Sequence, residues 1–511
     1  MPRLRLNAAR SHAIVALSGA SLALAFPEPG LGFVAWIAVV PLLTLATGER
    51  ARRGATLALA FGLGFFGLLL YWISIVGFLG WIVLVVLQAA FLACFGVLWA
   101  VLSRFDHGLA RIGLAATAWV SIEFLRSQVP VGGFTWGQLA QSQTEVSLLL
   151  PVASLGGGWL VAGLVIVLNA AVVELVVAAR AQRRLAPAPL LIIVALLAAP
   201  LAVPSNEATG DSLRVAIVQG NVPQDFRGPY YEKELAILAS HQHLTEELDV
   251  VEPDLVVWPE SSVGLDLTTN EDAARAVRAS AQAVDAPMIV GGNLDVDDDR
   301  YKVVALHVDA TGEVVDTYQK THLVPFGEYV PARNVFGWIP ALEQVPRDAI
   351  AAGEPVVFDV AGGAVAPVIS FEGDFGSLVR RPIAEGGRLL VVATNTSTWG
   401  YSWASAQHVA FSQVRAVENG VWVAHAALSG ISAFVTPNGE VVDATSLWTA
   451  TALVEQLRFA ESITLYARYG DWFCWLSLVV TVLALALRWR RRRTRPEAPP
   501  GPVKEPVIIV M

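Results

Sequence analysis

Long stretches almost free of charge constrain the fold of this 511-residue chain more than any other feature. A helix needs about 20 consecutive apolar residues to cross about 30 Å of hydrocarbon. Seven apolar runs of roughly that length precede residue 205, and one follows residue 470. We expect the first run to be retained as a span and not cleaved as a signal peptide. The expected membrane spans are 12–28, 31–47, 55–77, 80–102, 109–127, 153–178, 187–204 and 472–489.

Charge is sorted along the chain in the same way. Hydrophobic residues make up 55% of the sequence and charged residues only 15%, which is typical of a protein with several membrane spans. Roughly 35 of the 44 acidic residues lie between 205 and 470, with about 16 of the 35 basic ones. The net charge of -9 is therefore a sum over two unlike regions, and it argues against a partner made of nucleic acid.

The arginines predict the orientation in the membrane. With seven spans followed by an eighth, five arginine-rich segments fall on one side, and Arg126 is the exception. The positive-inside rule makes that side cytoplasmic. We expect a membrane domain at 1–204, an extracytoplasmic domain at 205–470, a last span at 471–490, and a basic, then proline-rich, disordered cytoplasmic tail at 491–511. The five arginine-rich segments on the cytoplasmic side are 3–10, 50–53, 104–111, 180–184 and 488–495.

The region from 205 to 470 alternates short β-branched runs with helical patterns, which indicates a layered α/β domain. A hairpin is predicted around the Ala310-Thr-Gly312 turn. The expected strands are 214–219, 255–258, 288–291, 301–309, 313–318, 366–369, 389–393, 421–426 and 433–435, and the expected helices are 231–247, 270–284 and 404–419.

Three apolar runs in this domain end in reactive residues. They are Leu255-Val-Val-Trp-Pro-Glu260, Tyr318-Gln-Lys320 leading into His322-Leu-Val-Pro-Phe-Gly-Glu328, and Ala366-Pro-Val-Ile-Ser-Phe-Glu372. A strand end suits catalysis because the run is held in the core while its last residue emerges into a cleft. Together the three motifs resemble the Glu–Lys–Cys site of the nitrilase superfamily, in its membrane-bound branch, the apolipoprotein N-acyltransferases. The resemblance extends over nearly the whole chain.

The resemblance implies a nitrilase-like αββα sandwich and a role for each residue. Glu260 would be the general base, Lys320 would stabilise the oxyanion, and Ser370 would be the nucleophile. Glu328 and Glu372 match two accessory carboxylates that would orient Lys320 and keep it charged, or would have only a structural role. The chain departs from the family at Ser370, where a cysteine is usual, at Phe371, where a tyrosine is common, and in the 394–400 segment.

Cysteine usage makes the first departure decisive. The only two cysteines, Cys94 and Cys474, lie in apolar runs outside the 205–470 region. A thiol nucleophile in that region is therefore excluded, and so are a disulfide framework and a zinc site built from these two residues. A serine hydroxyl is much less acidic than a thiol, so Ser370 would depend on Glu260 during attack.

The implied reaction transfers an acyl chain from a phospholipid donor to the N-terminal α-amine of a lipoprotein acceptor, without a cofactor. Aromatic residues in expected loops would line an entry for acyl chains, or pack as ordinary loop residues. His241-X-His243 and Asp297–Asp299 have no companion ligands, so surface positions are expected for them and no metal. The candidate acyl-binding residues are Phe336, Trp338, Phe371 and Trp399.

Two other functions fit the same residues. Without its thiol, the chain could be an inactive homologue that binds lipoproteins or serves as a membrane scaffold. Retention of Glu260 and Lys320 with both accessory carboxylates favours activity over that alternative, because a scaffold does not need them. A membrane amidase, with water as the acceptor, is the third possibility.

Overall fold

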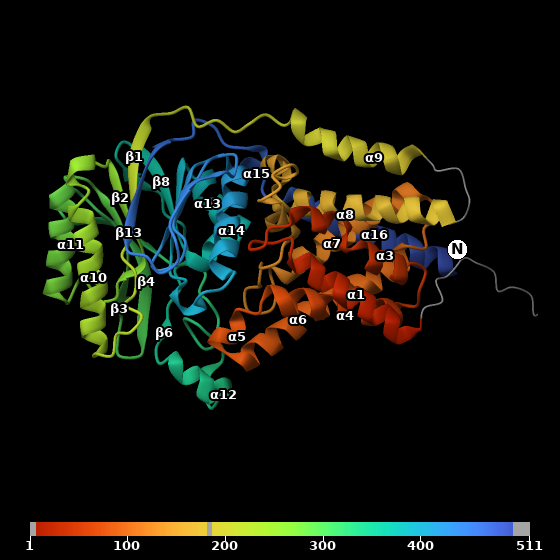
Figure 1. Ribbon diagram of the computed structural model, residues 1–511, viewed down its shortest axis with the longest axis horizontal. Coiled ribbons are helices and arrows are strands. Elements are labelled where there is room, and N and C mark those ends of the chain that lie inside the picture. Colours follow the sequence, from red (N-terminus) through yellow and green to blue (C-terminus); the bar gives the residue numbers. More distant parts are fainter. Residues whose placement is uncertain (1–6, 181–186, 494–511) are drawn as a thin grey trace, which may run out of the picture.

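The computed structural model describes residues 7–180 and 187–493, and it has two parts that lie end to end (Figure 1). One part is a bundle of apolar helices, and the other is a layered α/β domain. The predicted proline-rich tail lies outside the described residues. The helices of the bundle are α1 (Ala8–Ala23), α2 (Ala35–Ala38), α3 (Val40–Ala46), α4 (Ala51–Leu69), α5 (Ile73–Val76), α6 (Phe78–Leu102), α7 (Gly108–Arg126), α8 (Ala153–Arg180), α9 (Pro187–Ala198) and α16 (Trp472–Arg493).

Each of the eight apolar runs is helical over most of its described length, but the helices differ from the expected spans in length. Four helical segments among the described residues are long and apolar enough to cross a membrane: Phe78–Leu102, Gly108–Arg126, Leu150–Ala179 and Trp472–Arg491. The others are shorter or broken. For example, α3 has a proline in its first turn, and a proline there cannot donate the backbone hydrogen bond that would continue α2 into α3.

The longest helix, α8, bends where it meets the α/β domain. Gly157 has a φ of 72° inside this helix, which disfavours any residue with a side chain. A Cβ atom at Gly157 would also lie 2.6 Å from the ring of Tyr466. The bend frees the backbone N–H of Gly158, which donates to Oε1 of Glu418 at 2.7 Å. The two parts of the molecule are joined at this point.

The α/β domain contains two β-sheets. The first has the strand order β13-β1-β2-β3-β4-β5 with β6 paired to β4, and the second has the order β12-β11-β10-β9-β8-β7. The strands of the first sheet are β1 (Ser212–Gln219), β2 (Leu255–Val263), β3 (Met288–Asp295), β4 (Arg300–Val308), β5 (Val314–Gln319), β6 (Asp348–Ala349) and β13 (Thr451–Arg458). Those of the second are β7 (Phe358–Val360), β8 (Gly363–Ile369), β9 (Leu389–Thr394), β10 (Val423–Ala427), β11 (Ala433–Val435) and β12 (Val441–Ala444).

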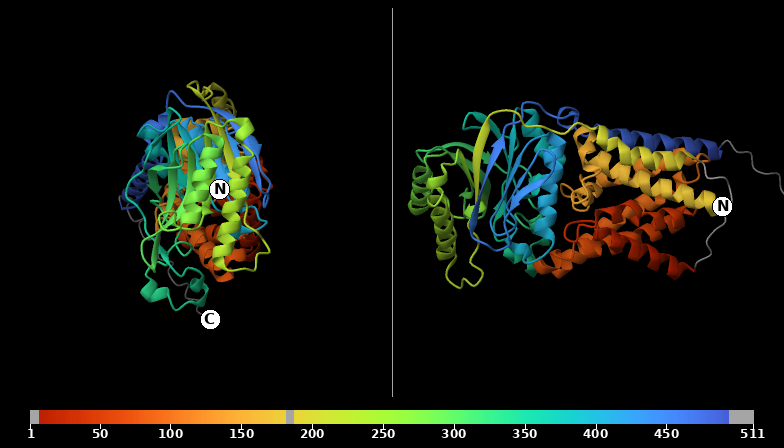
Figure 2. Two further views of the ribbon diagram at one scale, coloured as in Figure 1. Left: turned by 90° about the vertical axis from the view of Figure 1, so that its left-hand side faces the viewer. Right: turned by 45° about the horizontal axis from the view of Figure 1, so that its top comes forward.

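The two sheets pack face to face with helices outside them. One apolar cluster joins residues such as Ile217 and Val257 to Ile369 and Val391 between the sheets. A second cluster lies between the first sheet and helices α10 (Tyr230–Glu246) and α11 (Glu271–Val284). A third joins the second sheet to α13 (Gly376–Ala384) and α14 (Ala404–Asn419). This arrangement is the αββα sandwich, and Figure 2 shows its layers from two further directions.

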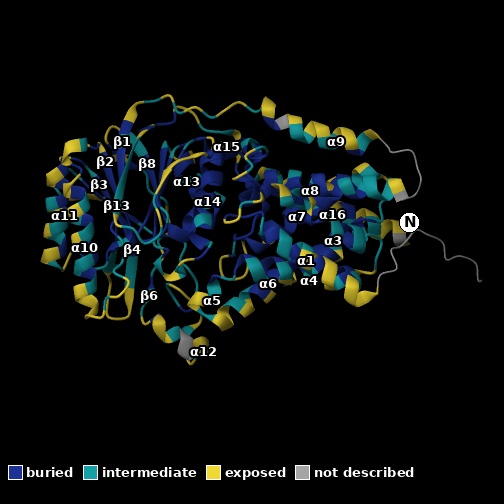
Figure 3. Cartoon of the chain, viewed as in Figure 1, coloured by how far each residue is buried: buried dark blue, intermediate teal, exposed yellow. Residues whose placement is uncertain are grey.

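Helix α14 has no free face, because it is covered by the second sheet on one side and by the helical bundle on the other. All but one of its residues are buried, and Figure 3 shows buried residues on both sides of it. Phe411, Val414 and Val417 of α14 belong to the same apolar cluster as the helices of the bundle. The α14 face of the α/β domain therefore rests directly on the apolar helices of the bundle.

The predicted strands and helices of this domain are confirmed. Strands β6, β7, β12 and β13 and helix α13 were not predicted, although β13 pairs with β1 over its whole length. Glu260 does not end its strand: β2 continues to Val263 beyond a register shift, and Ser261 has a φ of 61°. The shift turns Glu260 out of the ladder while the strand goes on.

Candidate active site

Lys320 lies at the centre of the candidate site and has no exposed surface. It follows β5, and its backbone N–H donates to Val303 O at 2.9 Å, so that the ladder holds its main chain. Its Nζ atom donates to Oε1 of Glu260 at 2.9 Å and to Oε1 of Glu328. An ammonium group has three donors, and these two carboxylates use two of them.

Burial and the neighbouring charges shift the pKa values of Lys320 and Glu260. Burial alone would lower the pKa of Lys320, but the carboxylates of Glu260 and Glu328 outweigh it and hold that pKa above its usual range. Burial raises the pKa of Glu260; Lys320 opposes this rise and Glu328 adds to it. Lys320 is therefore a fixed cation, and Glu260 is a stronger base than an exposed glutamate.

Ser370 opens the short 3-10 turn Ser370–Asp374 directly after β8 and is almost fully buried. Its φ of 51° lies in the left-handed region, an uncommon conformation for a residue with a side chain that often marks functional sites. Strands β8 and β9 are parallel, and Ile369 pairs with Ala393. The next residues along each strand, Ser370 and Thr394, are therefore neighbours, and the Thr394 hydroxyl donates to Ser370 Oγ at 3.1 Å.

Glu260 and Ser370 are held by consecutive residues of one segment. The backbone N–H of Asn395 donates to Oε2 of Glu260 at 2.9 Å, while Thr394 holds Ser370. No hydrogen bond joins Glu260 to Ser370 directly among the described residues. Apo enzymes often show such loose contacts between base and nucleophile, which tighten when substrate binds.

Glu372 forms no hydrogen bond or ion pair with Lys320 among the described residues, but its charge helps to hold the pKa of Lys320 above its usual range, as expected. Its Oε1 atom accepts from the Tyr318 hydroxyl at 2.8 Å and from the backbone N–H groups of Thr321 and His322 at 2.7 and 3.0 Å. Its Oε2 atom accepts from Ile369 N at 2.8 Å. Glu372 thus ties the lysine segment to the serine turn, whereas Glu328 alone pairs with Lys320 as predicted.

A second buried polar pair lies beneath the serine turn. Nε2 of His408 on α14 is 3.3 Å from Oδ1 of Asp374, the last residue of that turn. Burial raises the pKa of Asp374 well above its usual range and lowers the pKa of His408 to about 3. Burial therefore disfavours the charged form of each partner. The contact joins the serine turn to α14.

The candidate acyl-binding residues divide into packed and exposed ones. Trp399 packs against Trp72 of the bundle, with ring centroids 4.8 Å apart, and Phe371 stacks on His322 with centroids 5.5 Å apart. Phe336 and Trp338, at and just after α12 (Arg333–Phe336), are 40% and 80% exposed.

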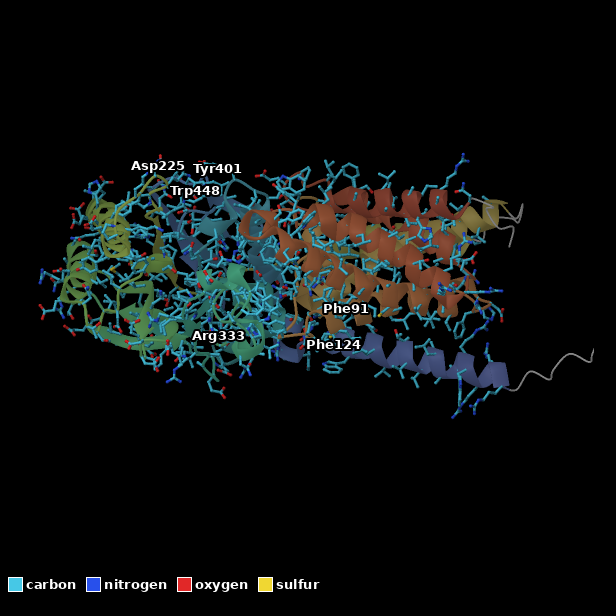
Figure 4. All side chains as sticks on the ribbon, turned by 90° about the horizontal axis from the view of Figure 1, so that it is seen from below. Phe91, Phe124, Asp225, Arg333, Tyr401 and Trp448 are labelled. Carbon is cyan, nitrogen blue, oxygen red and sulfur yellow. The ribbon has the colours of Figure 1, made fainter. Side chains whose placement is uncertain are left out.

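The aromatic residues of the 394–403 segment do not form one group. Tyr401 lies beside Trp448, with ring centroids 6.1 Å apart, whereas Trp403 packs on Tyr71 of the bundle. Figure 4 shows Tyr401 and Trp448 together at the opposite edge of the view from Arg333 of α12. The segment therefore contacts both the α/β domain and the bundle.

The bundle also reaches the site through the loop after α7. Trp136 Nε1 donates to Gln407 Oε1 on α14 at 2.7 Å. Gly132 approaches His322 so closely that a Cβ atom there would lie 2.7 Å from the imidazole ring. Arg126, the arginine expected outside the basic clusters, is buried and holds this loop through Trp136 O at 2.7 Å. The site therefore lies where the two parts of the molecule meet.

The histidines and aspartates weighed as metal ligands have other partners. His241 is not on the surface as expected: it is fully buried and accepts from Gly220 N at 3.1 Å. Asp297 pairs with Arg300 at 2.6 Å. The described residues contain no group of three or more His, Cys, Asp or Glu side chains that could hold a metal ion.

Sequence reasoning missed Thr394 and Asp374. Thr394 could have been found, because a helix joins two parallel neighbouring strands here and their carboxyl ends meet at one edge of the sheet. Asp374 carries no such signal, because nothing in its sequence neighbourhood shows that its side chain is buried against α14.

Two family descriptions match the chain. Residues 18–171 match the apolipoprotein N-acyltransferase N-terminal domain, and residues 214–465 match the carbon-nitrogen hydrolase domain. A protein named apolipoprotein N-acyltransferase from Geobacter metallireducens is 31% identical over 94% of this chain and 96% of its own. One of the same name from Mycolicibacterium smegmatis is 29% identical over 92% of this chain and 82% of its own.

Among solved structures, a mutant of the Nesterenkonia AN1 amidase from the nitrilase superfamily is similar to this chain. It has 18% sequence identity and a TM-score of 0.38, and the match covers 50% of this chain and 92% of that chain.

Replacing Thr394 by valine should weaken acyl transfer without disturbing the fold. The change keeps the shape of the side chain and removes the hydrogen bond to Ser370, which is worth about 1 kcal/mol, so we expect roughly a fivefold loss of kcat. Acylation of a lipoprotein N-terminus by the purified protein, followed by mass spectrometry, measures it. The matched control is Thr396→Val, because that buried hydroxyl bonds to Ser405 at 3.1 Å and not to Ser370. Equal effects of the two changes would contradict the assignment of Thr394.

The pKa of Glu260 predicts the pH dependence of the reaction. Burial raises this pKa, so the protonated, inactive form should persist to a higher pH than for an exposed glutamate. The kcat/KM for acylation of a lipoprotein N-terminus should therefore fall as the pH drops through a value above 4.5, the ordinary pKa of this group. Glu328→Gln removes a charge that raises the pKa of Glu260, so the acid limb should move to lower pH. If Glu328→Gln leaves the acid limb unchanged, protonation of Glu260 is not the cause of that limb.

Proposed function

The chain belongs to the apolipoprotein N-acyltransferase family, and we propose that it transfers an acyl chain from a phospholipid to the N-terminal α-amine of S-diacylglyceryl-cysteine lipoproteins. The observation that carries this proposal is the buried Lys320, paired with Glu260 and Glu328, beside the turn that holds Ser370. A scaffold protein would gain nothing from a buried cation in this place. The arrangement therefore favours a working enzyme over an inactive homologue.

In the first step, Ser370 attacks the carbonyl carbon of a phospholipid ester. The hydroxyl proton passes to Glu260, whose raised pKa suits it as a base. The carbonyl oxygen becomes an oxyanion and faces the third N–H of Lys320, the one that the carboxylates leave unused. The bond to the glycerol oxygen then breaks, that oxygen takes the proton from Glu260, and a lysophospholipid leaves. An acyl ester remains on Ser370.

In the second step, the lipoprotein amine attacks this ester. Its proton passes to Glu260, the bond between the acyl carbon and Ser370 Oγ breaks, and the serine recovers its proton. The product is an amide at the lipoprotein N-terminus. An oxygen ester reacts more slowly with amines than a thioester does, so turnover should be slower than with a cysteine nucleophile.

Aromatic side chains around the site would receive the acyl chains. Trp399 packs against the bundle and Phe371 stacks on His322, whereas Phe336 and Trp338 are exposed on the outer loop. Exposed aromatic residues favour the headgroup layer of a membrane. We assign the exposed pair to the entry and the packed pair to the wall of the acyl site.

We further propose a multi-pass arrangement, with residues 1–204 and 471–490 in the membrane and residues 205–470 outside the cytoplasm. Four helices of sufficient length support the membrane placement. The arginines near the starts of α1 and α4 and at the end of α16 support the orientation, because basic residues favour the cytoplasmic side.

Glu260→Gln should abolish acylation of lipoproteins while leaving the protein folded. Loss of the base should cost roughly 10²–10⁴-fold in rate. Mass spectrometry of the N-terminal peptide of a lipoprotein, incubated with phospholipid and enzyme, measures the product. Glu234→Gln, the same change at a buried glutamate of α10, is the matched control. Undiminished transfer by the Glu260 variant would exclude it as the base, and unmodified N-termini with the wild type would favour an amidase.

A phosphatase fused after Asp211 should be active outside the cytoplasm if the orientation is correct. Asp211 immediately precedes β1, so the fusion reports the side on which the α/β domain lies. A fusion within the linker after Arg104, between α6 and α7, is the control and should be inactive. The reverse pattern would overturn the proposed orientation.

A further inference from the structure

A basic hollow lies far from the candidate active site. It has a volume of about 600 Å³. The other end of α4 leads to Tyr71 and Trp72, which contact Trp403 and Trp399 of the α/β domain. At a rise of 1.5 Å per residue, the 19-residue helix α4 places the hollow about 28 Å from that contact. The residues that line the hollow are Gly48, Glu49, Arg50, Arg52, Arg53, Thr56 and Arg104.

The charge inside the hollow is strongly positive. Four guanidinium groups face one carboxylate, that of Glu49, which is 3.8 Å from Arg53. Arg104 donates to the Glu49 carbonyl at 2.6 Å. Among the described residues, the side chains of Arg50 and Arg52 have no hydrogen bond or ion pair. Two planar cationic groups at the hollow are thus free to bind a ligand.

The residues next to the hollow add positive charge and do not neutralise the charge of its arginines. Arg488 and Arg491 of α16 lie over the ring of Phe105, which follows Arg104 in the chain. The nearby carboxylate of Glu174 is already engaged by Arg111 in two hydrogen bonds. Asp106 is exposed and is the other acidic residue in this turn.

Helix α4 presents its N-terminus at the same place. Arg50 is the N-cap residue and makes no side-chain cap, and no acidic residue stands in the first turn. The backbone N–H groups of the first turn and the positive end of the helix dipole therefore favour an anion here. The helix N-terminus thus adds a weaker attraction for anions to the stronger one of the arginines.

We propose that this hollow binds the phosphate of an anionic phospholipid headgroup, in the leaflet on the far side from the α/β domain. Arginine forks match phosphate oxygens in pairs, and basic pockets between membrane helices suit anionic headgroups. The apolar outer faces of the neighbouring helices favour a lipid over a free anion: Leu17 of α1 is 72% exposed and Ile37 of α2 is 59% exposed. The acyl chains of the lipid would lie along such faces.

Native mass spectrometry of the full-length protein in detergent tests the proposal. All variants carry Ser370→Ala, so that the proposed acyl transfer cannot consume the lipid. Phosphatidylglycerol, phosphatidylcholine and inorganic phosphate are titrated separately. The parent should bind phosphatidylglycerol at least about tenfold more tightly than phosphatidylcholine. The pair Arg50→Gln with Arg52→Gln should lose this preference.

The matched control removes the same charge nearby. Arg490→Gln with Arg493→Gln changes two exposed arginines at the end of α16 that do not line the hollow, and it should keep the preference. If both double variants lose the preference for phosphatidylglycerol equally, the preference depends only on net charge, and the proposed site is wrong. Equal binding of the two lipids by the parent would also overturn it. Inorganic phosphate that competes fully with the lipid at equal concentration would overturn the lipid assignment and leave a site for soluble phosphates.

Discussion

The buried ammonium of Lys320 is the interaction on which the site depends. Removing one charge from water costs several kcal/mol, and only close carboxylates offset that cost. Here Glu260 reaches Lys320 from β2 and Glu328 from the loop after Lys320 itself. Loss of both carboxylates would leave the buried ammonium uncompensated, at about 3–5 kcal/mol, whereas loss of one leaves a one-to-one ion pair with the other. The same pairing keeps Lys320 positive and Glu260 basic, which is the combination that acyl transfer requires.

Three features of the structure fix the position of Ser370, which suits its proposed role as the nucleophile. The turn after β8 places Ser370 in a left-handed conformation, Thr394 of β9 holds its hydroxyl, and the contact between His408 and Asp374 joins the turn to α14. Helix α14 carries one member of that pair and rests on the bundle through Glu418 and Gly158. The position of Ser370, the proposed nucleophile, is thus coupled to the helical bundle.

Much of this could be predicted from the sequence, because strands and amphipathic helices leave periodic patterns and reactive residues follow apolar runs. The hairpin at 310–312 and the positions of Lys320 and Ser370 after their strands are examples. The rest depends on long-range pairing, which no local pattern records. Strand β13 is held by antiparallel pairing with β1, which lies some 240 residues earlier in the chain. The bulge at Glu260, the contacts of Glu372 and the burial of His241 likewise arise only once the layers have packed.

The most direct test of the central claim is the intact mass of the purified protein after incubation with phospholipid alone. Without an amine acceptor the acyl ester should accumulate, giving a mass gain equal to one acyl chain that resists neutral hydroxylamine and is absent in Ser370→Ala. In Ser370→Cys the same gain should become sensitive to hydroxylamine, because the linkage is then a thioester. A protein whose mass does not change, or a gain that persists in Ser370→Ala, would contradict a serine acyl-enzyme at this site.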